Sequence, residues 1–428
     1  MIANNSLPKH WQIKKLGEIC EKITKGGTPT TYGFAFVSSG VTFIKIENID
    51  NGKVILPSIK TFISEEAHNY QKKSKLEEND LLFSIAGTIG ETCLIKKEYL
   101  PANTNQALAI LRGYYKEVQP QFLTHQLNSS ISQYVKLKAR GGAMNNISLE
   151  DLKAIELVLP PLPEQQAIVS KIEELFSELD NGMAQLKTAK QQLKVYRQSL
   201  LKWAFEGKLT NKNVKEGELP KGWKDVELKG IVERISDGPF GSNLKSIDYV
   251  NEGVRVIRLE NIGEMEFRNE YKTFVTQEKY ETIKRYTVGK GDIIFSSFIS
   301  ESIRSVILPD YIESAINKAD CFLVRVSEAT VSKKYLAYYF STKAMQNQLV
   351  NQIHGATRPR INTTQLKASK IPFAPLKEQQ LIVSELESKL TVCDKIEETI
   401  SQSLQQAETL RQSILKKAFE GKLIKTKP

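Results

Sequence analysis

The 428-residue sequence is poor in the residues that build disulfide frameworks and metal sites. Its four cysteines, Cys20, Cys93, Cys321 and Cys393, are scattered and form no C-x-x-C pair. That spacing argues against a Cys-based zinc site and a disulfide-rich secreted domain, and it favours a reducing, cytoplasmic setting. Of the four histidines, no two have ligand spacing. We therefore predict that the protein holds no metal.

Long apolar runs and cofactor motifs are missing as well. No stretch of 18 apolar residues occurs, and the N-terminus lacks the apolar core of a signal peptide, so the sequence predicts neither a membrane span nor secretion. An F-x-G-x-G loop, an N-P-P-[YF] or D-P-P-[YF] pocket and a G-x-x-x-x-G-K-[ST] loop are all absent. The one nuclease-like string, residues 225–229, places its Asp too close to the E-x-K. We predict no cofactor and no independent catalysis.

What the chain does have is size and positive charge. Its length and its 40% hydrophobic residues suffice for roughly two to four domains with buried cores. The formal net charge is +11 and the pI is about 9.1. A basic balance of this kind favours a polyanionic partner without identifying it.

An internal repeat organises the whole sequence. Residues 162–170 recur at 376–384, and residues 197–209 recur at 411–423, both with a shift of 214. Fainter matches upstream, such as residues 44–49 with 257–262 and 80–84 with 292–296, have shifts of 212 or 213. The repeat predicts four segments. Globular parts lie at 1–160 and 211–375, and each is followed by a segment, at 161–210 and 376–428, in which the two copies are more similar to each other.

The two more similar segments, 161–210 and 376–428, are predicted to form long helices. In the first copy, one heptad track carries Ile172, Leu179, Leu186, Leu193 and Leu200, and a second carries Ile168, Leu175, Gly182, Ala189, Tyr196 and Trp203. The second copy keeps Leu386, Cys393, Ile400, Ala407 and Ile414, while its other track is weaker or slips toward Leu390 and Leu404. Since a long amphipathic helix needs a partner for its stripe, we expect the two copies to pair antiparallel with approximate two-fold symmetry.

The positive charge lies in the globular parts. The net charges of the four segments, in chain order, are +4, +1, +5 and +1. Polar, Gly-rich loops recur at equivalent places in both globular parts, where Arg can bind guanine or phosphate, Asn can bind adenine, and Gly lets the backbone approach a groove. From these loops and nearby basic positions we predict the following DNA-binding residues: Lys25, Gly26, Gly27, Thr28, Lys45, Asn48, Arg140, Asn145, Asn146, Ser242, Arg258, Asn261, Arg304, Lys318, Thr357, Arg358 and Arg360.

These features together resemble the specificity subunit of type I restriction-modification systems. The resemblance rests on the duplicated helix block, with L-P-P-L-P-E-Q-Q at its start (residues 159–166) and A-F-E-G-K-L at its end (residues 204–209). The G-G-T-P motif at 26–29 and the D-G-P-F-G-S motif at 237–242 also look like those of target recognition domains. One departure is Lys377, which stands where the first copy has Pro163.

The resemblance implies an α/β fold, with two target recognition domains separated by two antiparallel coiled-coil helices. Each domain would read one half of a bipartite site on double-stranded DNA, and the helices would set the spacer and dock two modification subunits that methylate adenine N6. Restriction or translocase subunits are possible further partners. The alternative is a structural adaptor, in which a coiled-coil spacer joins two protein-binding domains. A third interpretation, a fused methylase-nuclease fragment, lacks its cofactor loop.

Overall fold

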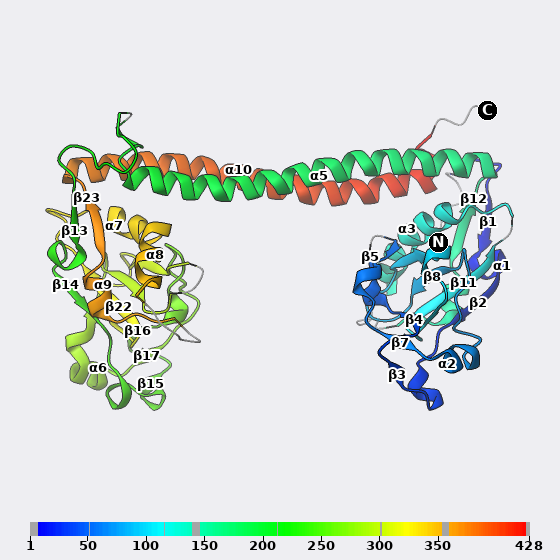
Figure 1. Cartoon of the computed structure of the whole chain (residues 1–428), viewed down its shortest axis with the longest axis horizontal. Helices are drawn as coiled ribbons and strands as arrows, with labels where there is room; N and C mark the ends of the chain where they lie inside the picture. The colour runs from blue at the N-terminus through cyan, green and yellow to red at the C-terminus, as the bar shows by residue number, and fades with distance from the viewer. Residues whose placement is uncertain are drawn as a thin grey trace. The chain divides into compact units, whose positions relative to one another are not determined.

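A computed structural model describes residues 7–50, 52–114, 116–138, 146–211, 213–299, 302–352 and 359–424, without the side chains of 130–138. The chain forms two compact units, unit 1 with residues 1–186 and 402–428, and unit 2 with residues 187–401. Each unit contains one sheet-bearing part and half of each long helix (Figure 1). Each unit therefore comprises one globular segment of the repeat and a part of both helical segments.

The main sheet of unit 1 is antiparallel. Its strands lie in the order β2 (Cys20–Lys25), β11 (Leu108–Tyr114), β8 (Leu81–Ser84) and β9 (Thr92–Leu94). The central strands are buried on both faces, which is why residues 81–83 and 108–111 are uninterrupted apolar runs. Leu81 and Phe83 face one apolar cluster, whereas Leu82 faces another.

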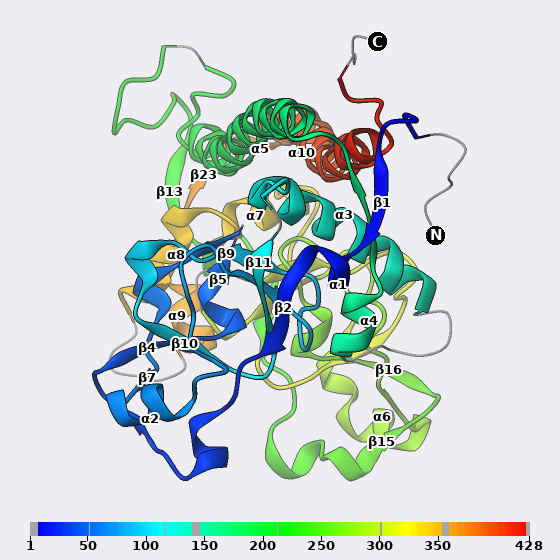
Figure 2. The same cartoon turned by 90° about the vertical axis from the view of Figure 1, so that its right-hand side faces the viewer.

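Shorter strands and helices complete unit 1. A second sheet has the order β10 (Ala102–Thr104), β4 (Val41–Ile44), β7 (Phe62–Ile63) and β3 (Phe36–Val37), with β10 and β4 parallel. Two strand pairs join β1 (Gln12–Lys15) with β12 (Glu156–Leu159) and β5 (Ile49–Asp50) with β6 (Lys53–Val54). The helices are α1 (Leu16–Ile19), α2 (Glu65–Tyr70), α3 (Pro120–Lys138) and α4 (Leu149–Lys153). In Figures 1 and 2, α3 lies beneath the long helices.

Unit 2 repeats this plan. Its main sheet has the order β14 (Arg234–Ser236), β22 (Cys321–Arg325), β19 (Ile293–Ser296) and β20 (Ser305–Ile307). The second sheet has the order β15 (Tyr249–Val250), β17 (Phe274–Val275), β16 (Val254–Ile257), β21 (Ala315–Asn317) and β18 (Thr287–Val288), and β13 (Lys224–Glu227) pairs with β23 (Lys370–Phe373). The helices are α6 (Gln277–Ile283), α7 (Lys333–Phe340), α8 (Lys343–Val350) and α9 (Thr363–Lys367). The predicted α/β class and tandem repeat are confirmed.

Two long helices, α5 (Leu162–Phe205) and α10 (Leu376–Phe419), pair antiparallel within each unit, as predicted. In unit 1, Arg411 forms an ion pair with Asp180. In unit 2, the equivalent Arg197 lies 2.6 Å from a carboxylate oxygen of Asp394, which is equivalent to Asp180. These cross-helix pairs repeat with the same shift of 214 that relates the two sequences.

The burial of the helices agrees with most of the predicted seam. The first track of α10, from Leu386 to Ile414, is buried at all five positions, and Leu390 packs against the core of unit 2. On α5, Ile172, Leu193 and Leu200 are buried. The predicted positions Leu175, Leu179, Leu186 and Ala189 are half-buried. The prediction is wrong for Gly182, which is exposed, and for Tyr196 and Trp203, which are 42% and 40% exposed. Leu201 and Ala204 are buried on the same stretch of α5.

The repeated E-Q-Q motif anchors the first turn of each long helix to its unit. Gln165 is buried, accepts a hydrogen bond from the Gln119 amide (2.9 Å) and donates to the carbonyls of Glu117 and Pro160 (both 2.8 Å). Gln379 makes the equivalent bonds in unit 2. Since α10 begins at Leu376, equivalent to Leu162, the replacement of Pro163 by Lys377 does not move the start of the helix.

The A-F-E-G-K-L motif ends each long helix where it packs against a sheet-bearing part: α5 ends in unit 2 and α10 ends in unit 1. Phe205 packs edge-on to Tyr335 in unit 2, and Phe419 packs edge-on to Phe122 in unit 1. The glycines that follow, Gly207 and Gly421, have φ angles of 74° and 71°, the left-handed conformation that commonly ends a helix. A Cβ at Gly207 would lie 2.1 Å from a ring carbon of Pro220, so only glycine fits.

Candidate nucleic-acid interface

In unit 2, the predicted site residues come from segments that meet around one turn, residues 317–320. A Cβ at Gly238 would lie 2.3 Å from the carbonyl oxygen of Asn317, so glycine lets the 237–242 loop pack directly on this turn. The Lys318 amide donates to the carbonyl of Ile257 (2.8 Å), which brings the end of β16 to the same place. Ser242 is exposed on this loop.

Two cations lie side by side at this turn. The Lys318 ammonium donates to the carbonyl of Leu244, and its pKa is lowered by burial and by the charge of Arg258. Arg258 lies 2.8 Å from a carboxylate oxygen of Glu260 and stacks 5.6 Å from the ring centroid of Tyr249. Lys318 and Arg258 thus place two cations near this turn, and Glu260 partly balances the charge of Arg258.

Arg304 and Arg360 approach the same turn from two other segments. Arg304 donates to the carbonyl of Leu259 (3.2 Å) and to the hydroxyl of Ser296 (3.3 Å). Arg360 pairs with Asp320 (3.1 Å) and lies 5.9 Å from the ring centroid of Phe298. The structure thus brings together Ser242, Arg258, Arg304, Lys318 and Arg360.

A half-buried carboxylate, that of Asp237, supports this cluster. Asp237 accepts from its neighbour, the Gly238 amide (2.7 Å), and from the Asp320 amide (2.9 Å). Burial raises the pKa of Asp237 to about 6, although both amide hydrogen bonds act in the opposite direction. Asp320 in turn accepts from the Ser297 hydroxyl (2.9 Å) and holds Arg360.

Unit 1 places its candidates around the equivalent turn, residues 104–107. A Cβ at Gly26 would lie 2.1 Å from the Thr104 carbonyl oxygen, and the Gly27 amide donates to that oxygen (3.1 Å). The Thr28 hydroxyl donates to the side chain of Gln106, while Lys25 is exposed at the end of β2. Lys45 lies 5.6 Å from the ring centroid of Phe36, as Arg258 does from Tyr249.

The last described candidates are also equivalent across the repeat. Asn146 pairs with Ala86 through an isolated β-bridge, and Arg360 pairs with Phe298 in the same way. Both residues are exposed. Arg140, Asn145, Thr357 and Arg358 lie outside the described residues.

The prediction for Asn48 and Asn261 is corrected by the structure. Asn261 is fully buried, accepts from the Arg258 amide (2.9 Å) and donates to the carbonyls of Arg268 and Tyr271 (both 2.8 Å). Asn48 is 4% exposed, accepts from the Lys45 amide (2.9 Å) and donates to Ser58. Their amides stabilise the turns that carry Lys45 and Arg258 and are buried, so they do not lie at the surface of these turns.

Sequence reasoning missed a cleft in unit 1 that opens beside Gly26 and Gly27. It has a volume of about 590 Å³ and is also lined by Tyr32, Tyr70, Gln71, Lys72 and Lys73, among others. A basic pair follows the short helix in both units, as Lys72-Lys73 and Lys284-Arg285. Because the pair occurs in both units, it does not mark this cleft, and no sequence pattern distinguishes it.

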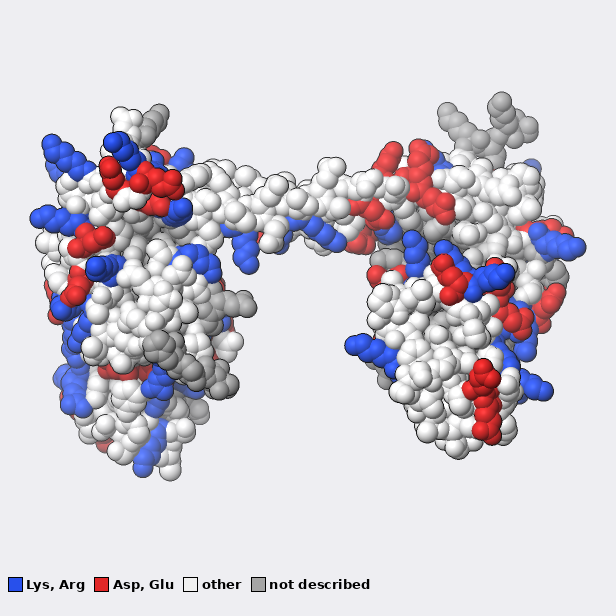
Figure 3. Space-filling model, in the orientation of Figure 1, with Lys and Arg blue, Asp and Glu red and all other residues white. Residues whose placement is uncertain are grey.

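Basic side chains lie over the sheet-bearing parts of both units (Figure 3). On the face shown in Figure 3, Lys and Arg side chains lie over both sheet-bearing parts, with Asp and Glu among them. Within the described ranges, no three His, Cys, Asp or Glu side chains converge where they could hold a metal ion. No described helix is long and apolar enough to cross a membrane.

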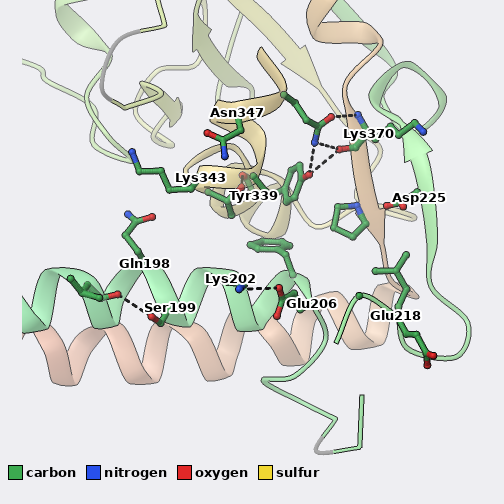
Figure 4. Close-up of a pocket in the computed structure, with 18 residues that line it drawn as sticks. Gln198, Ser199, Lys202, Glu206, Glu218, Asp225, Tyr339, Lys343, Asn347 and Lys370 are labelled. Atoms are coloured by element: carbon green, nitrogen blue, oxygen red, sulfur yellow. Dashed lines mark hydrogen bonds and ion pairs between the residues drawn. The ribbon is translucent and has the colours of Figure 1, made fainter. Parts of the chain in front are cut away.

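A second cavity, of about 780 Å³, lies in unit 2 between α5 and the helices α7 and α8. Figure 4 shows Gln198 pointing from α5 toward Lys343, with Tyr339 and Lys370 on the sheet-bearing side. Phe205, Leu219 and Pro372 supply apolar lining. On α5 itself, Val195 lines this cavity and is 61% exposed.

The two units are thus two copies of one sheet-bearing domain, each with candidate contact residues around an equivalent turn. The profile of the type I restriction modification DNA specificity domain matches residues 8–191 and 220–406. The chain belongs to this family and carries the domain twice. The structural-adaptor alternative has no comparable support.

Individual relatives agree with this family. The chain is 26% identical to the EcoBI specificity subunit from Escherichia coli over 413 residues, which are 92% of this chain and 84% of that protein. It is 23% identical to the MjaVIII specificity subunit from Methanocaldococcus jannaschii over 427 residues, 97% of this chain and 94% of that one. Specificity subunits of type I restriction enzymes are therefore its relatives along nearly the whole chain.

Solved structures share the fold. The HsdS subunit from Thermoanaerobacter tengcongensis matches with a TM-score of 0.61 and 20% identity, covering 97% of this chain and 98% of that chain. A chain from a structural study of the assembly and conformational transition of the type I R-M system matches with a TM-score of 0.74 and 20% identity, covering 97% and 99%.

Proposed function

We propose that this chain is the DNA-reading subunit of a type I restriction-modification complex, in which each sheet-bearing part contacts one half of a bipartite site on double-stranded DNA. The observation that carries the proposal is the repeated cluster: equivalent segments converge on residues 104–107 in unit 1 and 317–320 in unit 2. Glycine allows the close packing in both, while the exposed side chains differ.

Those differences in exposed side chains would account for a DNA site whose two halves have different sequences. Lys45 stands where unit 2 has Arg258, Asn146 where it has Arg360, and Asn105 where it has Lys318. Arginine can bind guanine N7 and O6 with two hydrogen bonds, whereas lysine binds as a single charged donor and asparagine suits adenine. Two domains with one scaffold and different contact residues would read different half-sites.

Docking of two methyltransferase subunits is supported by the outer faces of the long helices. Tyr196 and Leu410 are equivalent, and both are exposed, 42% and 51% respectively. Large apolar side chains at the same exposed position twice suit two copies of one partner. Methylation of adenine N6, and cleavage where restriction or translocase subunits join, would be carried by those partners. The proposed setting is the cytoplasm.

The test is co-expression of the chain with the adenine methyltransferase of its system, followed by mapping of N6-methyladenine in the host DNA. We expect methylation at one asymmetric motif made of two specified halves and a non-specified spacer. Methylation at a short continuous palindrome, or no dependence of the motif on this chain, would contradict the proposal.

A further inference from the structure

The cleft in unit 1 contains a buried hydrogen-bond donor without a partner. Gln71 is 6% exposed, and its Oε1 accepts from the hydroxyl of Ser74 (3.2 Å). Its Nε2 has no hydrogen-bond partner among the described residues. Burying such a donor without an acceptor is unfavourable, so a group that supplies an acceptor here would be bound favourably.

The surroundings of Gln71 are cationic. Lys25, Lys72 and Lys73 are exposed and line the same cleft, and no acidic residue is among its described lining. A Cβ at Gly27 would lie 3.2 Å from the Tyr32 ring, so glycine keeps that side of the cleft open. A ligand that combines negative charge with several acceptor oxygens, as a phosphate group does, fits these donors.

Unit 2 shows that the fold does not require this cleft. Between Ser64 and Asp80 the repeat runs without a gap to Thr276 and Asp292, which places Ile283 at the position of Gln71. The same shift of 212 places Leu244 at the position of Tyr32. Ile283 and Leu244 are 4% and 1% exposed and pack in one apolar cluster with Val256, Val275 and Ile316. At the positions of Gln71 and Tyr32, unit 1 thus has polar side chains where unit 2 has apolar ones, although a basic pair follows the short helix in both units.

We propose that the Gln71 cleft binds a phosphodiester group of the DNA backbone in the half-site contacted by unit 1. The inference rests on the proposed function. The loop formed by residues 25–28 borders the cleft and carries the candidate contact residues, so a phosphate held by Gln71 and the three lysines would position that loop on the duplex. Unit 2 would lack this contact.

Phosphate-ethylation interference with the full chain, in complex with its methyltransferase and its bipartite DNA, tests the inference. We expect one or two phosphates in the unit 1 half-site whose ethylation blocks binding of the wild type but has no effect on Gln71→Glu. This isosteric change keeps the acceptor for Ser74, removes the donor and adds a negative charge. Affinity for DNA should fall about tenfold at low salt.

Asn69→Asp is the matched control. Asn69 is exposed on α2, two residues from Gln71, and accepts from the Lys75 ammonium (2.8 Å), so the variant adds the same charge outside the cleft. It should retain the wild-type interference pattern. Gln71→Ile, which copies unit 2, should lose the same contacts as Gln71→Glu without added charge.

The outcomes separate this inference from the proposed function. An unchanged pattern in Gln71→Glu, with interference at both half-sites, would overturn the phosphate contact and leave the proposed function standing. No interference at two half-sites in the wild type would refute the proposed function itself. Thermal stabilisation of the free chain by inorganic phosphate, lost in Gln71→Glu without a change in the DNA pattern, would assign the cleft to free phosphate and overturn the DNA assignment.

Discussion

At the scale of single residues, identity across the repeat marks structural roles and difference marks the candidate contacts. Arg112 binds Asp80 through two nitrogens, and Arg325 binds Asp292 in the same way. Asn48 and Asn261 also occupy equivalent buried positions. The exposed positions around the two turns carry different side chains, as Asn146 and Arg360 do.

Replacing Asn261 should destabilise unit 2 without changing which bases are read. Asn261→Ala leaves the Arg258 amide and the Arg268 and Tyr271 carbonyls without their buried partner, so we expect a loss of about 2–4 kcal/mol in the free energy of unfolding. Urea unfolding measures it. The exposed Asn146→Ala serves as control and should change stability by less than about 0.5 kcal/mol.

Arg360→Ala should relax reading of one half-site only. Loss of a base contact lowers discrimination at that position by about 1–3 kcal/mol. Methylome sequencing of cells carrying the variant should show a degenerate base in one half of the motif, and Asn146→Ala, at the equivalent position, should affect the other half. Arg358→Ala is expected to act on the same half as Arg360→Ala. Equal loss at both halves would instead indicate general phosphate binding or misfolding.

Asp237 should make unit 2 less stable as the pH rises through its folded pKa. Because burial raises that pKa to about 6, the folded state binds more protons than the unfolded state between about pH 4 and 6, and stability falls over this window. Asp237→Asn removes the ionisable group. The free energy of unfolding of this variant, relative to wild type, should therefore increase with pH and level off above about pH 7. Urea midpoints at pH 5, 6 and 7.5 check the trend, and a constant difference between the two proteins would refute it.

The misplaced asparagines show where sequence reasoning fails at this scale. Asn48 and Asn261 are predicted as DNA contacts because asparagine can bind adenine, yet both recur because each closes a turn with its amide. Gln71 was missed for the opposite reason: it differs from Ile283, and one unpartnered donor has no sequence pattern. Solvent exposure and hydrogen-bond partners, which only the folded chain supplies, separate these cases.

At the scale of elements, the long helices followed from the sequence more fully than the sheets. Their heptad spacing predicts which residues of α10 are buried, because one antiparallel partner covers the stripe along its length. The same spacing misplaces Tyr196 and Trp203. At the C-terminal end of α5, the sheet-bearing part of unit 2 competes for the helix surface and buries Leu201, Ala204 and Phe205 instead. Two-residue strands such as β3 and β17 depend on distant partners and have no local pattern.

The exposed position shared by Tyr196 and Leu410 provides a test of subunit docking. We expect Tyr196→Asp to release one methyltransferase copy and Leu410→Asp the other, because a charge buried in an apolar contact is strongly unfavourable. Native mass spectrometry of the co-expressed complexes should show one copy lost in each single variant and both in the double variant. Lys187→Asp, at an exposed position of α5, is the control for added acidity and should retain both copies.

At the scale of the whole molecule, the net charge of +11 belongs mainly to the two globular segments, with +1 on each helical segment. Composition alone permits many basic proteins. The repeat, the two equivalent clusters and the family match support a more specific proposal, in which two DNA-binding domains are joined by paired helices. The bases that each cluster reads depend on side-chain geometry against DNA, which no pattern in a single sequence supplies.

The most direct test of this account is a paired deletion in the two helices. Removing residues 185–191 and 399–405, one heptad at equivalent positions, shortens each helix by about 10 Å and keeps the heptad phase. Methylome sequencing with the co-expressed methyltransferase should then show both half-sites unchanged and a spacer shorter by about three base pairs. An unchanged spacer, with both half-sites still methylated, would contradict the role of the helices in setting the distance between two DNA readers.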